Sequence, residues 1–151
     1  MKPWTTAEFR AHVSHLGCWV NDHGLAAHWR PVKLSVGSEH DFRQARAFAY
    51  CTDTAPIMVV VAPDFDAQSR VRQVALIRHE LGHALEFMVG RSVVLSVIDV
   101  AGYDLSTWGG TERRADALAE VVFGEEIAYD KADVQTTRNG ARPRPSRLGG
   151  C

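Results

Sequence analysis

The sequence predicts a small α+β domain, in which an antiparallel or mixed sheet of about three strands packs on three helices. Helical periodicity occurs in three separate segments, and three short apolar runs with strand character lie between the first two. The chain has 151 residues, which is enough to bury a core in one domain. We expect residues 1–130 to form that single domain. Residues 131–151 have no helical or strand periodicity, and we expect them to form a disordered basic tail.

The first helix is expected to start after Thr5 or Thr6, because either hydroxyl can cap it and Glu8 then lies in the first turn. Apolar residues follow at helical spacing as far as Gly24: Phe9, Val13, Leu16 and Val20.

Three potential metal ligands, His12, His15 and Cys18, are spaced by three on this helix. A second metal site is conceivable there. However, side chains spaced by three drift around a helix, so we expect solvated or half-buried side chains instead. The cysteines, Cys18, Cys51 and Cys151, are odd in number and lack disulfide or metal spacing. They are expected to be reduced thiols in a cytoplasmic protein.

Three strands are expected between residues 32 and 62. Residues 32–36 alternate apolar and polar side chains, as a half-buried strand does. Residues 45–51 and 56–62 are the second and third candidates, with a turn at 52–55. If one strand borders a substrate cleft, its edge could hold an extended peptide by main-chain pairing. The sequence does not identify which strand that would be.

The middle helix is expected over residues 69–88, where there is no proline and Gly82 is the only glycine. Asp64, Asp66 or Ser69 could cap its start, and Gly90 marks its end. An apolar stripe at helical spacing predicts one buried side: Val74, Ile77, Leu81, Leu85 and Met88.

The same helix carries the pattern His-Glu-x-x-His at residues 79–83. Residues four apart lie on one face of a helix, so His79 and His83 can aim both imidazoles at one metal ion. Glu80 lies beside that point, where its carboxylate can take a proton from metal-bound water. Two histidines on a helix can also be ordinary surface or core residues. The pattern nevertheless favours a metal site, because a buried helix has little structural use for it.

The stretch after Gly90 is ambiguous. Residues 93–100 could form a helix or a strand, and the glycines at 102, 109 and 110 predict a loop. The loop aromatics Tyr103 and Trp108 could simply pack. Alternatively, Tyr103 could act as a catalytic residue that donates a hydrogen bond to a developing oxyanion, and Trp108 could line a substrate pocket.

The last helix is expected over residues 112–122 with Thr111 as its cap. Its acidic residues share one face: Glu112, Asp116 and Glu120. Small residues, Ala115 and Ala119, flank that face and would let this helix approach the metal helix closely. An acidic stripe is often only a solvated face. Beside a two-histidine site it also offers a third ligand, for which Glu112 is our first choice, with Asp116 and Glu120 as alternatives.

These residues resemble the zincin metallopeptidases of the gluzincin type. The segment 79–83 matches the commonest form of the His-Glu-x-x-His motif. The pattern Glu112-x-x-Ala115-Asp116-x-x-Ala119 is similar to the second helix of ImmA/IrrE-type, HtpX-type and minimal single-domain gluzincins. The resemblance covers these two helices. It implies that His79, His83 and Glu112 bind Zn²⁺ and that Glu80 is the general base. It also implies that the Asp116 carboxylate orients a histidine.

The expected function is therefore that of a zinc-dependent metalloendopeptidase acting on a peptide or protein substrate. Two alternatives remain: a protease with one dedicated target, such as a repressor, and a zinc-binding interaction module without catalysis. The net charge of −1 does not favour a nucleic-acid partner, and no segment reads as a signal peptide or a membrane span.

Overall fold

The computed structural model describes residues 7–42, 45–53 and 55–129. It confirms the α+β class, with five helices and a three-stranded mixed sheet in this part of the chain. The helices and strands follow in the order α1 (Ala7–Asp22), β1 (Val32–Val36), β2 (Ala47–Tyr50), β3 (Ile57–Val61), α2 (Arg70–Val89), α3 (Arg91–Val100), α4 (Leu105–Trp108) and α5 (Thr111–Phe123).

The sheet has the order β1-β3-β2, so the apolar strand β3 lies in the centre. β1 runs parallel to β3, with Val32 opposite Ile57. β2 runs antiparallel to β3, with Ala47 opposite Val61. The three predicted strands are thereby confirmed, and β1 and β2 are the two edges.

The two faces of the sheet bury different clusters, because successive side chains of a strand point to opposite sides. One face of β3 contributes Ile57, Val59 and Val61 to the main core, which also contains the buried sides of α1, α2, α3 and α5. The other face carries a smaller cluster around Phe42 and Val60. The helices therefore cover one side of the sheet.

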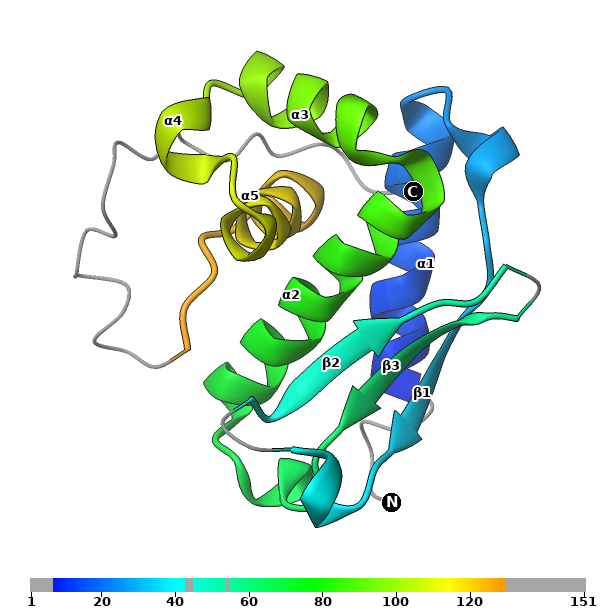
Figure 1. Ribbon diagram of the computed structural model, residues 1–151, viewed down its shortest axis with the longest axis vertical. Coiled ribbons are helices and arrows are strands. Elements are labelled where there is room, and N and C mark those ends of the chain that lie inside the picture. Colours follow the sequence, from blue (N-terminus) through cyan, green and yellow to red (C-terminus); the bar gives the residue numbers. More distant parts are fainter. Residues whose placement is uncertain (1–6, 43–44, 54, 130–151) are drawn as a thin grey trace.

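Helix α2 is the element around which the others pack (Figure 1). It contacts β2 and β3 of the sheet as well as α5, and α1 packs against both α2 and α5. The backbone N–H of Arg72 donates to Ser69 Oγ at 3.2 Å, so Ser69 is the N-cap of α2, one of the three residues expected for that position. Gly90 follows the helix with φ of 90°, a conformation that glycine adopts without strain, and the chain turns there into α3.

The structure decides one open alternative and corrects two local expectations. The ambiguous residues 93–100 belong to helix α3, whose Val94 and Ile98 are buried in the core. The expected loop contains the short helix α4, capped by Asp104, which accepts a hydrogen bond from the Ser106 N–H. Thr111 is the first residue of α5 and not its cap, because Gly110 occupies the N-cap position without a side-chain bond.

Two further expectations concern the cysteines and the chain ends. Cys51 is a free, half-buried thiol. Cys18 is disulfide-bonded, so the expectation of a reduced thiol is wrong for this residue. The expected caps Thr5 and Thr6, the tail 131–151 and Cys151 lie outside the described residues. In the ranges that are described, no helix combines the length and the apolar character that a membrane crossing requires.

Candidate metal centre

The His-Glu-x-x-His segment lies in the middle of α2 and brings three potential metal donors together. Donor atoms of His79, Glu80 and His83 all lie within 4.8 Å of one another. His79 and Glu80 are buried, with exposed fractions of 8% and 4%, and His83 is half-buried. One turn of helix separates the two imidazoles, whose ring centroids are 4.7 Å apart.

The position of these donors follows from the two sides of α2. The predicted apolar stripe is largely buried in the main core, where Ile77, Leu81 and Leu85 are almost fully covered. Another side of α2 faces α5, and there Gly82 lies directly against the backbone of Ala115. One turn before the motif, Ala75 packs with Ala119 of α5. The small residues of both helices therefore permit the close approach that the sequence predicts.

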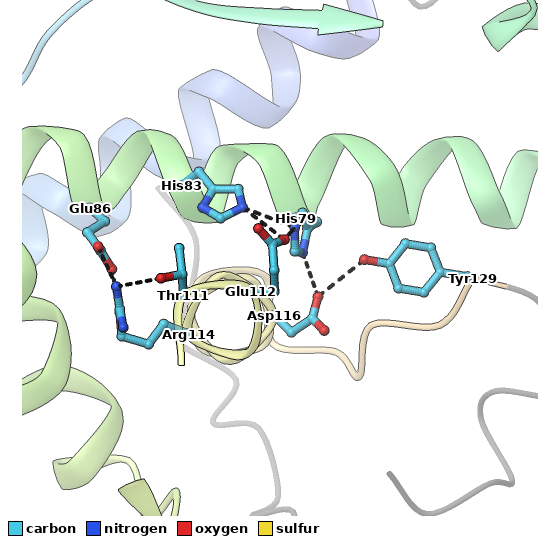
Figure 2. A network of polar contacts seen from close by, with 8 residues as sticks. All are labelled: His79, His83, Glu86, Thr111, Glu112, Arg114, Asp116 and Tyr129. Atoms are coloured by element: carbon cyan, nitrogen blue, oxygen red, sulfur yellow. Dashed lines mark hydrogen bonds and ion pairs between the residues drawn. The ribbon is translucent and has the colours of Figure 1, made fainter. Parts of the chain in front are cut away.

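Helix α5 crosses beside the motif and adds two carboxylates (Figure 2). One Glu112 oxygen lies 2.8 Å from His79 Nε2 and 3.3 Å from His83 Nε2. The two Nε2 atoms are 3.1 Å apart. Two imidazole nitrogens and one carboxylate oxygen thus converge on a single point between the helices.

This donor set fits a zinc ion. Zinc binds histidine nitrogen and carboxylate oxygen at about 2.0–2.2 Å in tetrahedral sites, which places neighbouring ligand atoms about 3.3 Å apart. The three observed separations, 2.8, 3.1 and 3.3 Å, are close to that edge length. Glu80 belongs to the same cluster. Glu112 contacts both imidazoles directly, so it stands beside Glu80 as a candidate third ligand.

The second ring nitrogen of His79, Nδ1, contacts the carboxylate of Asp116 on α5. His79 Nδ1 lies 2.7 Å from Asp116 Oδ1. Because a carboxylate only accepts hydrogen bonds, Nδ1 carries a proton, and in the neutral ring Nε2 then has its lone pair free for a metal. The Tyr129 hydroxyl donates to the same Oδ1 at 3.3 Å. Figure 2 shows this row of contacts running from His79 through Asp116 to Tyr129.

The charges of the cluster shift the pKa values of its buried members. Burial alone would lower the pKa of His79, but the hydrogen bond that His79 donates to Asp116 and the negative charges of Asp116, Glu80 and Glu112 outweigh it and raise that pKa to about 9. Burial raises the pKa of Glu80 to about 7, even though the nearby His79 charge opposes the rise. A buried acid and a buried base thus lie side by side with strongly perturbed pKa values, as is common at functional sites.

The two remaining members shift in the directions expected of partners in a cation site. Burial and the positive charge of His79 lower the pKa of His83. Burial would raise the pKa of Glu112, but the charges of His83 and His79 and its hydrogen bonds to them lower it overall. A neutral imidazole and an ionised carboxylate are the forms that bind a metal.

The third acidic residue of the predicted stripe has a different role. Glu120 is fully buried, and its two carboxylate oxygens accept from the Tyr103 hydroxyl at 2.8 Å and from the Ile127 backbone N–H at 3.1 Å. It therefore fixes the segment that follows α5. Glu112, Asp116 and Glu120 do share one stretch of α5, but the structure gives each its own partner.

The loop aromatics are placed inside the molecule. Tyr103 is 3% exposed, and its hydroxyl is used by Glu120. Trp108 is fully buried and packs edge-on against Tyr103, with ring centroids 5.1 Å apart. These positions favour packing over the electrophile and pocket roles considered from the sequence.

The residues on α1 do not form a second cluster. His12 Nδ1 contacts the Glu8 carbonyl oxygen at 2.9 Å, and His15 Nε2 contacts the Val122 carbonyl oxygen at 2.7 Å. Cys18 is disulfide-bonded. Within the described part of the chain, the His79 cluster is the one group of three that could hold a metal.

A cleft of about 440 Å³ lies next to the candidate metal centre. Its lining combines β2 with α2 and the start of α5: Ala47, Phe48, Ala49, Glu80, His83, Glu86, Phe87, Thr111 and Glu112, together with Ala45 before the strand. β2 is therefore the strand that borders the site, which the sequence could not identify.

A largely buried ion pair links α5 to α2 beside this cleft. Arg114 Nε and Nη2 donate to the two Glu86 oxygens at 2.7 and 2.8 Å, and Nη1 donates to the Gly109 carbonyl oxygen at 2.6 Å. The Arg114 side chain is only 3% exposed. It ties the start of α5, which carries Glu112, to the α2 residue one turn after His83.

Sequence reasoning missed three residues of this region: Glu86, Arg114 and Tyr129. Glu86 and Arg114 read as ordinary charged positions of amphipathic helices. Tyr129 follows the last helix in a segment without periodicity, so no local pattern connects it to His79.

Comparison with protein-family models, with curated protein sequences and with solved structures finds no match to this chain.

Proposed function

We propose that the protein is a zinc-dependent metallopeptidase, in which His79, His83 and Glu112 hold the ion and Glu80 is the general base. The observation that carries the proposal is the convergence of two Nε2 atoms and one Glu112 oxygen within 2.8–3.3 Å of one another, with Glu80 in the same cluster. A closed structural zinc site has no use for a fourth, titratable group at that place.

When bound there, zinc would supply a Lewis acid that polarises a scissile carbonyl and lowers the pKa of a water molecule. Glu80 would then be the residue that accepts a proton from the attacking water and returns a proton to the leaving amine. Burial raises the pKa of Glu80 in the metal-free protein, and a buried carboxylate beside the ion is placed to serve in both transfers. Asp116 keeps the His79 ring oriented through its contact with Nδ1.

The cleft supports an extended peptide as the substrate. β2 pairs with β3 on one side, and its other side borders the cleft beside Glu80 and His83. A free strand edge can pair with an extended backbone through main-chain hydrogen bonds. Small side chains on this wall, Ala47 and Ala49, leave room for the substrate chain. We therefore place the scissile bond between β2 and the metal ligands.

The direct test compares the wild-type protein with Glu80→Gln on a denatured protein substrate, with added zinc and with a chelator. We expect the wild-type protein to cleave only when zinc is present. Glu80→Gln should still bind zinc stoichiometrically but lose about 10²–10⁴-fold in rate, because the proton acceptor is gone. Asp99→Asn on α3, whose side chain is exposed, is the matched control and should cleave normally.

The other outcomes separate the two alternatives. Zinc binding without cleavage of any denatured protein or peptide library would indicate a binding module without catalysis. Cleavage of one protein, with no activity on a broad peptide library, would indicate a dedicated target. Cleavage by Glu80→Gln at the wild-type rate would contradict the role given to Glu80.

A further inference from the structure

We propose that Tyr129 is a positioning residue for the metal centre and that it acts through Asp116 on His79. This inference rests on the proposed metal site but adds a residue from outside the two ligand-bearing helices. The contact that defines it is the hydrogen bond from the Tyr129 hydroxyl to Asp116 Oδ1, at 3.3 Å.

Both hydrogen bonds of this row end on one oxygen atom. His79 Nδ1 contacts Asp116 Oδ1 at 2.7 Å, and the Tyr129 hydroxyl approaches that same atom (Figure 2). The Asp116 side chain is 16% exposed, so solvent has limited access to it. Two donors from different segments therefore fix one carboxylate, and the direction of this carboxylate fixes the imidazole plane of His79.

Tyr129 is held in place by an independent anchor. The Ile127 N–H donates to the fully buried Glu120 carboxylate at 3.1 Å, two residues before Tyr129. Ile127 itself packs with Ala75 of α2 and Ala119 of α5, and Tyr129 is packed against the same cluster. The segment after α5 is thus folded back against the two helices, which brings the phenol ring to Asp116.

In this arrangement, the segment after α5 contributes Tyr129 to the orientation of a proposed metal ligand. Loss of the hydroxyl leaves Asp116 with one donor fewer and a freer side chain, so His79 spends less time in the ligating orientation. A direct hydrogen-bond partner of a metal-bound histidine is typically worth about 10–100-fold in metal affinity. Tyr129 is one bond further away, and we expect its hydroxyl to be worth about three- to tenfold.

The experiment measures zinc affinity by competition with a chromophoric chelator, for the wild-type protein and for Tyr129→Phe. The matched control is Tyr50→Phe, which removes a hydroxyl from an exposed tyrosine on β2. We expect about three- to tenfold weaker zinc binding for Tyr129→Phe and no change for Tyr50→Phe. Cobalt substitution adds a spectroscopic measurement, because a misoriented His79 should shift the visible absorption bands of the bound ion.

A second pair of variants separates positioning from general support of the fold. If Tyr129 acts through Asp116, then Tyr129→Phe should have no further effect on zinc affinity in an Asp116→Ala background. An equal loss in both backgrounds would show that the hydroxyl acts elsewhere and would overturn the inference. The thermal midpoint of each variant in chelator reports any loss of folding that is unrelated to the metal.

The outcomes for the inference and for the proposed function are distinct. A wild-type protein that binds zinc, with Tyr129→Phe binding it equally well, overturns the role of Tyr129 and leaves the metallopeptidase proposal intact. A wild-type protein that binds no zinc overturns both.

Discussion

Gly82 of α2 faces the backbone of Ala115 in α5 so closely that a Cβ at residue 82 would lie 2.3 Å from the Ala115 carbonyl oxygen. Real Cβ atoms do not approach a backbone oxygen to that distance, and the obstacle is main chain that cannot rotate away. The separation of the two helices, and with it the distance from the imidazoles to Glu112, depends on the missing side chain at this position.

Gly82→Ala should therefore push α5 away from α2. We expect the free energy of unfolding to fall by about 1–3 kcal/mol, as overpacking of a core does, and zinc affinity to fall with it. Urea denaturation and a zinc titration provide the two measurements. Gly17→Ala in α1 is the matched control, because a Cβ there meets only the Trp29 ring at an ordinary 3.5 Å. That change should stabilise the protein, since alanine favours a helix more than glycine does.

Removal of Glu112 should abolish zinc binding as completely as removal of His79. Both donate an atom to the same convergent point, and a site with two ligands left binds zinc weakly. Metal analysis of His79→Ala, Glu112→Ala and Glu80→Gln after purification in zinc checks this assignment. Retention of zinc by Glu112→Ala together with its loss in Glu80→Gln would instead make Glu80 the third ligand.

In chelator, the protein should lose stability as the pH rises from about 6.5 to 9. The pKa of His79 is raised from 6.5 to about 9 in the folded protein, so folding favours its protonated form. That contribution is fully present below pH 6.5 and is lost as the pH passes the folded value. The rise corresponds to on the order of 3 kcal/mol. Denaturant unfolding at several pH values measures it, and His79→Ala should flatten the dependence.

The same reasoning applies to Glu80 at lower pH. Its pKa is raised from 4.5 to about 7, so folding favours its protonated form, and this contribution to stability is lost as the pH rises from 4.5 to 7.

With zinc present, the fall in stability above pH 6.5 should reverse, because zinc binds only the neutral form of His79 and stabilises the folded state. A rise in stability between about pH 6.5 and 9 in chelator would contradict the positive charge assigned to His79.

Arg114→Met should destabilise the protein more than the loss of any surface ion pair. It would remove one member of a largely buried pair and leave Glu86 without the partner that, as the largest cause, lowers its pKa. Breaking a buried pair in this way costs about 3–5 kcal/mol. The double variant Arg114→Met with Glu86→Leu should recover much of the loss. For comparison, Glu39→Ala removes an exposed partner of Arg46 and should cost less than about 1 kcal/mol.

The sequence predicted those parts of the fold whose local pattern and burial agree. The alternation in β1 and the stripe of α2 each describe an element with one more buried side, the apolar run of β3 describes a strand buried on both faces, and each element is found. Helix α3 was ambiguous because its valines and isoleucine favour strands as much as buried helices. The order of the strands depends on contacts between distant segments, so the edge position of β2 had no local signal.

At the site, the motif on α2 predicted its own geometry because one helical turn relates His79 to His83. The sequence also predicted that the acidic residues of α5 share one face. It did not predict which role each of these carboxylates has. Which carboxylate meets the imidazoles and which is buried depends on where α5 crosses α2. Glu120 is fully buried only because Tyr103 and the Ile127 N–H reach it from segments without periodicity.

Helix α2 has one apolar, buried side and another side that carries the imidazoles, so insertions within it are poorly tolerated. Each residue of an α-helix advances the side chains by about 100° around the axis. A single insertion before His79 would therefore turn the imidazoles toward the sheet or the solvent and move the apolar residues behind them out of the core. Point substitutions on the outer surface of α2 do not change the angle around the helix axis between the imidazoles and the apolar residues. Insertions are tolerated best in connections outside the helices and strands.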